Sequence, residues 1–269
     1  MVGVRSWRLP SRSVGLPSGL GAYYFLMIAL LYLPILLLVL FSVNNNTALS
    51  FPMRGLTTRW YEAVLDTPGL LRAARNSLLV AVGSSLVATL LGTMISVLAA
   101  RYSFRGKLAL IGLAVLPLIV PFVVLGVSLL LLFSAFGLDR SLWTVGVAHT
   151  VVALPYVMLI VIARLSDFDP GLEEAAMDLG ADYPMTLRRI VLPIIAPAMA
   201  AAALVAFTVS FDEFALALFL AGPDPTFPVY LFGQLRFANR LPVMIALAMG
   251  MMAATLFLAL LAERLRRSG

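Results

Sequence analysis

The sequence predicts an all-α membrane protein with six membrane-spanning helices. Of its 269 residues, 62% are hydrophobic and only 12% are charged. Soluble domains carry about 45–50% apolar residues and about 25% charged residues. The charged residues also leave six charge-free stretches, each longer than the about 18 residues that indicate a spanning helix. These stretches are 21–43, 76–100, 108–138, 141–163, 190–211 and 241–262.

The first stretch is preceded by Arg5, Arg8 and Arg12, as a signal peptide would be. Its apolar run exceeds the about 7–15 residues of a signal-peptide core, and no small-x-small cleavage site follows. We therefore expect an uncleaved spanning helix. A polar segment, 44–75, follows it and contains Trp60 at a spacing that predicts a short helix on the membrane surface.

The third and fifth stretches carry paired prolines. Pro117 and Pro121 lie four residues apart in the third stretch, and Pro193 and Pro197 lie four apart in the fifth. Each proline removes a helical hydrogen bond, so both helices are expected to bend. Such bends either line a cavity or serve packing, and both interpretations are open.

Basic residues predict the orientation. If the N-terminus is cytoplasmic, twelve of the 19 Lys and Arg residues fall inside and every inside segment carries three, which favours both termini in the cytoplasm. We expect one transmembrane domain, 1–269, with a tail (1–20), a core (21–262) and an inside loop (164–189). The inside residues are Arg5, Arg8, Arg12, Arg101, Arg105, Lys107, Arg164, Arg188, Arg189, Arg264, Arg266 and Arg267.

Several kinds of chemistry are disfavoured by what the sequence lacks. The net charge of +6 is spread along the chain, which suits lipid headgroups and not nucleic acid. The chain has no Cys and a single His, His149, so no metal site is expected. Lys107 is the only Lys and is not part of a P-loop, so the chain has no ATPase site of its own. His149 either forms hydrogen bonds between helices or relays protons.

The inside loop is the most specific segment. Asp169 and Pro170 can begin a helix, Gly180 can end it, and Asp182 can begin a second one, so the loop predicts a helix–Gly–helix unit. Its apolar stripe suits a groove in a partner, and acidic residues occupy the other side. The stripe is Leu172, Ala175, Ala176 and Leu179, and the acidic residues are Glu173, Glu174 and Asp178.

This loop resembles the signature of bacterial ABC importer permeases: Glu174-Ala175-Ala176, then Gly180, then Ile190-Val191-Leu192-Pro193. The resemblance implies the six-helix type I permease fold, with 172–180 acting as the coupling helix that docks on an ATP-binding subunit. Shorter segments, 31–35, 75–78, 148–150 and 210–214, resemble the second permease of spermidine/putrescine-type importers.

The resemblance further implies a multi-pass protein of the bacterial inner membrane. Its expected partners are a homologous permease in a heterodimer, two ATP-binding subunits that hold ATP and Mg, and an extracytoplasmic solute-binding protein. The chain itself would bind no cofactor. The expected solute is a polyamine, with amino-acid-derived, opine or aminophosphonate solutes as alternatives. An ion-coupled transporter or channel is disfavoured because the spans lack ionisable residues, and a scaffold without transport is a third alternative.

The candidate pathway residues are Phe211, Asp212, Glu213 and Phe214, at the outer end of the fifth stretch. Either the two carboxylates face water or pair with Arg236 or Arg240, or one of them attracts an ammonium group beside a phenylalanine ring. Neighbouring helical residues point about 100° apart, so only one carboxylate is expected to line the path. The resemblance favours Asp212.

Overall fold

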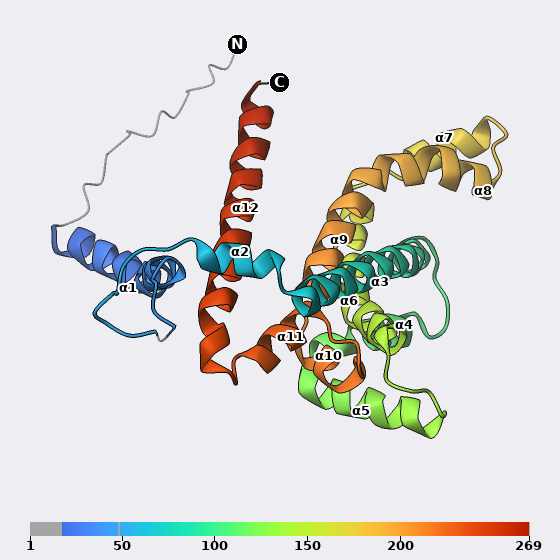
Figure 1. Ribbon diagram of the computed structural model, residues 1–269. Helices are drawn as coiled ribbons and strands as arrows, with labels where there is room; N and C mark the ends of the chain where they lie inside the picture. The colour runs from blue at the N-terminus through green and yellow to red at the C-terminus, as the bar shows by residue number, and fades with distance from the viewer. Residues whose placement is uncertain (1–17, 48, 269) are drawn as a thin grey trace, which may run out of the picture. The chain divides into compact units, whose positions relative to one another are not determined.

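The computed structural model describes residues 18–47 and 49–268, with some side chains after residue 253 left undescribed (Figure 1). Arg5, Arg8 and Arg12 therefore lie outside the described residues. The chain divides into two compact units, Met1–Val64 with Ala238–Gly269, and Leu65–Phe237.

In the first unit, α1 (Ser18–Ser42) packs against α12 (Leu241–Ser268), which follows the short turn η3 (Ala238–Arg240). The expected short helix near Trp60 is present as α2 (Arg59–Leu65). Trp60 Nε1 donates a hydrogen bond to the Asn44 carbonyl (2.8 Å), and this bond anchors α2 to the segment that follows α1.

In the second unit, three long helices form the core: α3 (Pro68–Arg101), α6 (Leu142–Ser166) and α9 (Leu192–Asp212). Small residues allow close approach, as is common between membrane helices. A Cβ placed on Gly92 of α3 would lie only 2.7 Å from Val157 Cγ1 of α6. Among the alanines at these contacts, Ala88, Ala153, Ala202 and Ala206 are fully buried.

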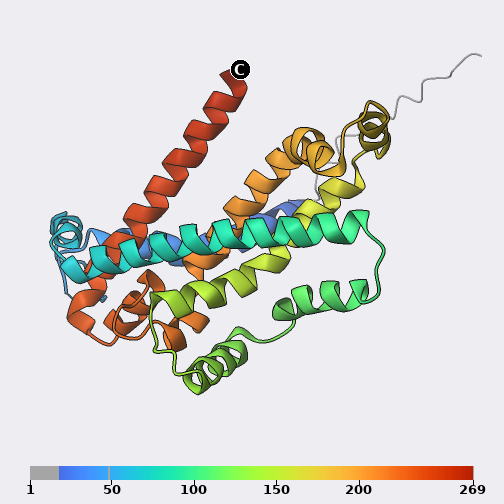
Figure 2. The same cartoon turned by 90° about the vertical axis from the view of Figure 1, so that its right-hand side faces the viewer.

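The third predicted span is bent, as its prolines indicate. It consists of α4 (Lys107–Val115), the 3₁₀ turn η1 (Leu116–Leu118) and α5 (Phe122–Ala135), with a bend of 109° (Figure 2). Pro117 lies in η1 and Pro121 directly precedes α5. In the fifth span, a π-helical turn, η2 (Leu187–Val191), leads into α9 just before Pro193.

Four short helices complete the second unit. α7 (Gly171–Asp178) and α8 (Tyr183–Thr186) lie at one end of the core, and α10 (Ala215–Leu220) and α11 (Phe227–Gln234) follow α9 at the other (Figure 1). Side-chain bonds attach the last two to the core: Ser77 Oγ of α3 accepts from the Phe227 amide (2.8 Å), and Thr144 Oγ1 of α6 donates to the Leu220 carbonyl (3.1 Å).

Apolar length supports several membrane crossings. Among the described residues, four helices are long and apolar enough to span a membrane, or five if the bent α4–α5 pair counts as one span. Among the same residues, a shorter apolar helix covers 238–253, which is η3 with the first part of α12. Only 6% of the most apolar window of α1 is buried within the chain, which leaves its side chains for lipid or another subunit. Thus the all-α membrane class is confirmed, and the number six stays a prediction.

Candidate functional site

The loop between α6 and α9 forms the predicted helix–Gly–helix unit. Asp169 Oδ1 accepts a hydrogen bond from the Gly171 amide (2.9 Å) at the start of α7, and Asp182 Oδ1 accepts from the Met185 amide (2.9 Å) at the start of α8. Between them, Gly180 has φ +89°, a left-handed conformation that glycine adopts without steric penalty. The chain therefore turns sharply after α7, as the sequence predicts.

The two faces of α7 differ from the sequence-based expectation. Leu172, Ala175 and Leu179 are exposed, Leu179 by 90%, whereas Ala176 is only 8% exposed. The prediction that all four apolar residues share one exposed stripe is therefore wrong for Ala176. Residues three apart on a helix face the same way, so Glu173 turns inward with Ala176 and is 7% exposed.

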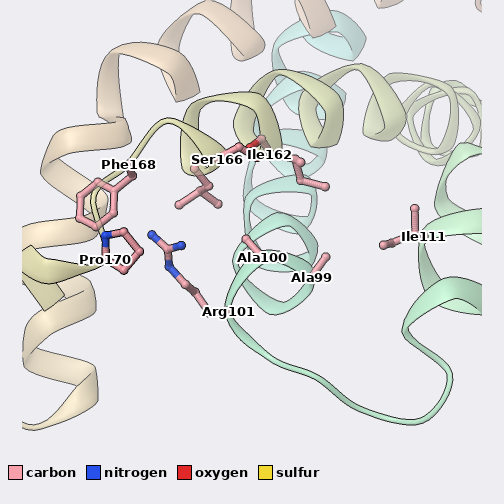
Figure 3. A pocket seen from close by; sticks show the side chains of 9 residues that line it. Ala99, Ala100, Arg101, Ile111, Ile162, Ser166, Phe168 and Pro170 are labelled. Atoms are coloured by element: carbon pink, nitrogen blue, oxygen red, sulfur yellow. Dashed lines mark hydrogen bonds between the residues drawn. The ribbon is translucent and has the colours of Figure 1, made fainter. Parts of the chain in front are cut away.

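Glu173 is held by a residue from another helix. Its Oε1 lies 2.7 Å from Nη2 of Arg101 at the end of α3, although the atoms are not aligned as a hydrogen bond. The Arg101 guanidinium also lies 5.1 Å from the centre of the Phe168 ring, and Figure 3 shows it directed toward Phe168 and Pro170. The expectation that the acidic residues occupy the side of α7 opposite the apolar stripe is therefore wrong for Glu173, which turns inward with Ala176. Glu174 is exposed.

The end of α3 contacts both halves of the loop. Beside the Arg101–Glu173 pair, the ring of Tyr102 makes an edge contact with Tyr183 of α8 (5.7 Å between ring centres). A pocket of about 320 Å³ opens next to Arg101, with Ile111 of α4 and Ile162 of α6 among its lining residues (Figure 3). Sequence reasoning treated Arg101 only as an inside positive charge. No local pattern in the sequence pairs Arg101 with Glu173.

At the opposite end of α9, the two adjacent carboxylates have different surroundings. Asp212 is exposed and Glu213 is buried. Glu213 accepts hydrogen bonds from the amides of Leu216 (2.9 Å) and Ala217 (3.2 Å) in α10, and its Oε2 lies 3.3 Å from His149 Nε2. The open alternative that Glu213 faces water or pairs with an arginine is therefore excluded.

The aromatic candidates at this end contact other rings. Phe211 stacks against Phe207 and Phe227, and Phe214 lies 4.9 Å from Phe232 between ring centres. His149 Nδ1 lies 2.8 Å from Ser210 Oγ, which confirms the interpretation of His149 as a hydrogen-bonding residue between helices.

Solved structures define the class of this fold. The chain superposes with a TM-score of 0.71 on a chain of a bacterial ABC transporter involved in import of the acidic polysaccharide alginate, covering 91% of this chain and 94% of that one at 14% identity. A second structure, the bacterial alginate ABC transporter in complex with alginate pentasaccharide-bound periplasmic protein, gives a TM-score of 0.64 at 19% identity, covering 88% and 90%. The fold is that of a chain of ABC importers.

The chain belongs to the family described as binding-protein-dependent transport system inner membrane component, whose model matches residues 92–268. It is 34% identical to the spermidine/putrescine transport system permease protein PotC of Haemophilus influenzae over 247 residues, 91% of this chain and 95% of that protein. It is 37% identical to PotC of Escherichia coli (strain K12) over 204 residues, which are 76% of this chain and 77% of that protein. The putrescine transport system permease protein PotI of the same strain is 36% identical over 214 residues, 77% and 76%. The family expected from the loop is confirmed.

Proposed function

We propose that this chain is the permease subunit of an ATP-driven importer of a polyamine such as spermidine or putrescine. The observation that carries the proposal is the similarity to PotC, which extends over 91% of the chain. The chain forms half of the translocation pathway with a homologous permease, and an extracytoplasmic binding protein delivers the solute. Two ATP-binding subunits hold ATP and Mg and hydrolyse the ATP, and the permease itself binds no cofactor.

ATP-dependent uptake by the reconstituted complex tests this proposal. The chain is co-expressed with its partners, placed in proteoliposomes with the binding protein and supplied with labelled spermidine, putrescine, an opine and an aminophosphonate. We expect uptake of the polyamines that needs both ATP and the binding protein. Uptake of another solute alone would contradict the polyamine assignment, and ATP-independent uptake would contradict the importer.

The proposed topology has six spans: α1, α3, the α4–α5 pair, α6, α9 and α12. Both termini and the α7–α8 loop then face the cytoplasm, because the basic inside segments favour that side. Reporter fusions after Gly269 and at Asp139 are expected to give opposite sidedness. Equal labelling of both sites from outside would contradict this arrangement.

The proposed docking surface on the ATP-binding subunit consists of the exposed residues of α7. Leu172, Ala175 and Leu179 supply the apolar face, and Glu174 supplies a charge for basic residues of the partner. The other residues shape the loop instead: the inward-facing Glu173 holds it to α3 and Ala176 packs beneath it, while the exposed Gly180 sets its turn.

Asp212 is proposed to bind an ammonium group of the solute in the pathway. A hydrogen bond to a charged group contributes about 1.5–3 kcal/mol, or about 10- to 150-fold in a rate or affinity. Asp212→Asn keeps the shape of the side chain and removes its charge. We expect spermidine uptake per ATP hydrolysed to fall at least about tenfold, with the complex still assembled.

The matched control is Asp224→Asn, which removes another exposed carboxylate between α10 and α11. Its uptake is expected to equal that of the unmodified complex. Equal uptake by Asp212→Asn and Asp224→Asn would place Asp212 outside the pathway.

A further inference from the structure

A chain of buried polar side chains crosses the core of the second unit. Ser84 of α3, His149 of α6, Ser210 of α9 and Glu213, which follows α9, are all less than a tenth exposed. Burying polar groups among so many apolar side chains is unfavourable unless the polar groups bind one another. Apolar packing alone would not require these four polar residues at buried positions.

Ser210 links Ser84 of α3 to His149 of α6. The Ser84 hydroxyl donates to Ser210 Oγ (2.8 Å), and Ser210 Oγ also lies within hydrogen-bonding distance of His149 Nδ1 (2.8 Å). His149 Nε2 lies 3.3 Å from Glu213 Oε2, a close polar contact in which the atoms are not aligned as a hydrogen bond.

Glu213 in turn fixes the start of α10. Both of its carboxylate oxygens lie within hydrogen-bonding distance of the Leu216 amide, and Oε2 also accepts from Ala217. These amides have no partner inside the helix, because the first turn of a helix leaves its N–H groups unpaired. The carboxylate therefore faces the protein interior, while Asp212 beside it is exposed.

We propose that His149 is a positioning residue for transport, which fixes the corner between α9 and α10 through Ser210 and Glu213 and so sets the direction in which Asp212 projects. This inference rests on the proposed role of Asp212. The corner is short: Glu213 has an extended backbone (φ −71°, ψ 120°) and Phe214 already precedes α10. A loss of the contact at His149 thus acts directly on the residue next to Asp212.

The test uses the intact complex in proteoliposomes with labelled spermidine. His149→Ala is expected to lower uptake per ATP hydrolysed about tenfold, which corresponds to about 1.4 kcal/mol, with unchanged assembly in size-exclusion chromatography. Ser210→Ala is expected to lower it in the same direction. His149→Gln, which keeps a polar side chain beside Ser210 and Glu213, is expected to recover most of the uptake. The matched control is Thr208→Ala, because Thr208 is an exposed hydroxyl residue on the same helix.

A double variant distinguishes positioning from general stability. If His149 acts through Asp212, the variant His149→Ala with Asp212→Asn transports no less than Asp212→Asn alone, because coupled residues are not additive. Additive losses, or loss of assembly in both His149→Ala and His149→Gln, would overturn the positioning role. Normal uptake by His149→Ala alongside impaired Asp212→Asn overturns this inference and leaves the proposed function intact. Normal uptake by Asp212→Asn overturns the role of both residues.

Discussion

Leu179→Arg is expected to prevent the ATP-binding subunit from docking and to reduce ATP-dependent uptake below about 1% of normal. Burying a leucine side chain contributes about 1.5–3 kcal/mol, and an arginine in its place would put an unpaired charge in an apolar groove. The two effects together exceed the about 2.7 kcal/mol that corresponds to a hundredfold loss. Co-purification of the ATP-binding subunit with a tagged permease measures docking, and proteoliposome uptake measures transport.

Leu179 is suited to this test because it is 90% exposed in the isolated subunit, so its replacement leaves the fold of the permease undisturbed. The matched variant Leu179→Met keeps the volume and is expected to dock normally. Ala176→Arg would be a poorer test, since Ala176 is buried against its own chain and any loss would mix misfolding with failed docking. Normal co-purification of Leu179→Arg would refute the proposed docking surface.

Arg101→Ala is expected to uncouple ATP hydrolysis from transport, with ATPase activity retained and uptake largely lost. Removing one partner of a buried ion pair is destabilising by about 3–5 kcal/mol, because the other charge stays buried. Here that charge is Glu173, and its burial without a cation favours displacement of α7 from the end of α3. The measurement is the ratio of solute imported to ATP hydrolysed, together with the thermal midpoint of the complex.

A second variant separates the ion pair from the position of the loop. Replacing both partners, Arg101→Met with Glu173→Leu, removes both buried charges and keeps apolar side chains of similar length. Replacement of a buried pair by apolar residues is often neutral or stabilising, so we expect the double variant to regain most of the coupling. If the double variant has a normal thermal midpoint but does not regain coupling, the charges themselves are needed. Normal coupling in Arg101→Ala would show that the pair is dispensable.

The sequence predicted helix positions well where prolines and glycines determine them. The bend at Pro117 and Pro121 follows from the restricted backbone of proline, and the turn at Gly180 follows from the conformational freedom of glycine. The charge-free stretch begins at Asn76, whereas α3 begins at Pro68. Such a stretch marks only the apolar part of a helix and not its first residue. Arg72 and Arg75 are good helix formers, so the helix includes them even though the apolar stretch does not.

The contacts of the candidate sites could not be predicted in the same way. In the sequence, 71 residues lie between Arg101 and Glu173, and no local pattern indicates that the two residues meet. Asp212 and Glu213 are adjacent and chemically alike, so composition cannot distinguish the exposed carboxylate from the buried one. What separates them is the position of His149 on another helix, which is known only once the helices are packed.

The length of α3 has a mechanical consequence. Its 34 residues extend about 51 Å at about 1.5 Å per residue, well beyond the about 30 Å of bilayer hydrocarbon, and Figure 2 shows it as one long rod. Ser77 near its start holds α11, and Arg101 at its end holds the loop, about 36 Å away. A rigid tilt of about 10° would move one end by about 6 Å relative to the other, roughly the rise of one helical turn. α3 can thus act as a lever arm that carries a displacement of the loop to the far side of the membrane without any change in its own hydrogen bonds.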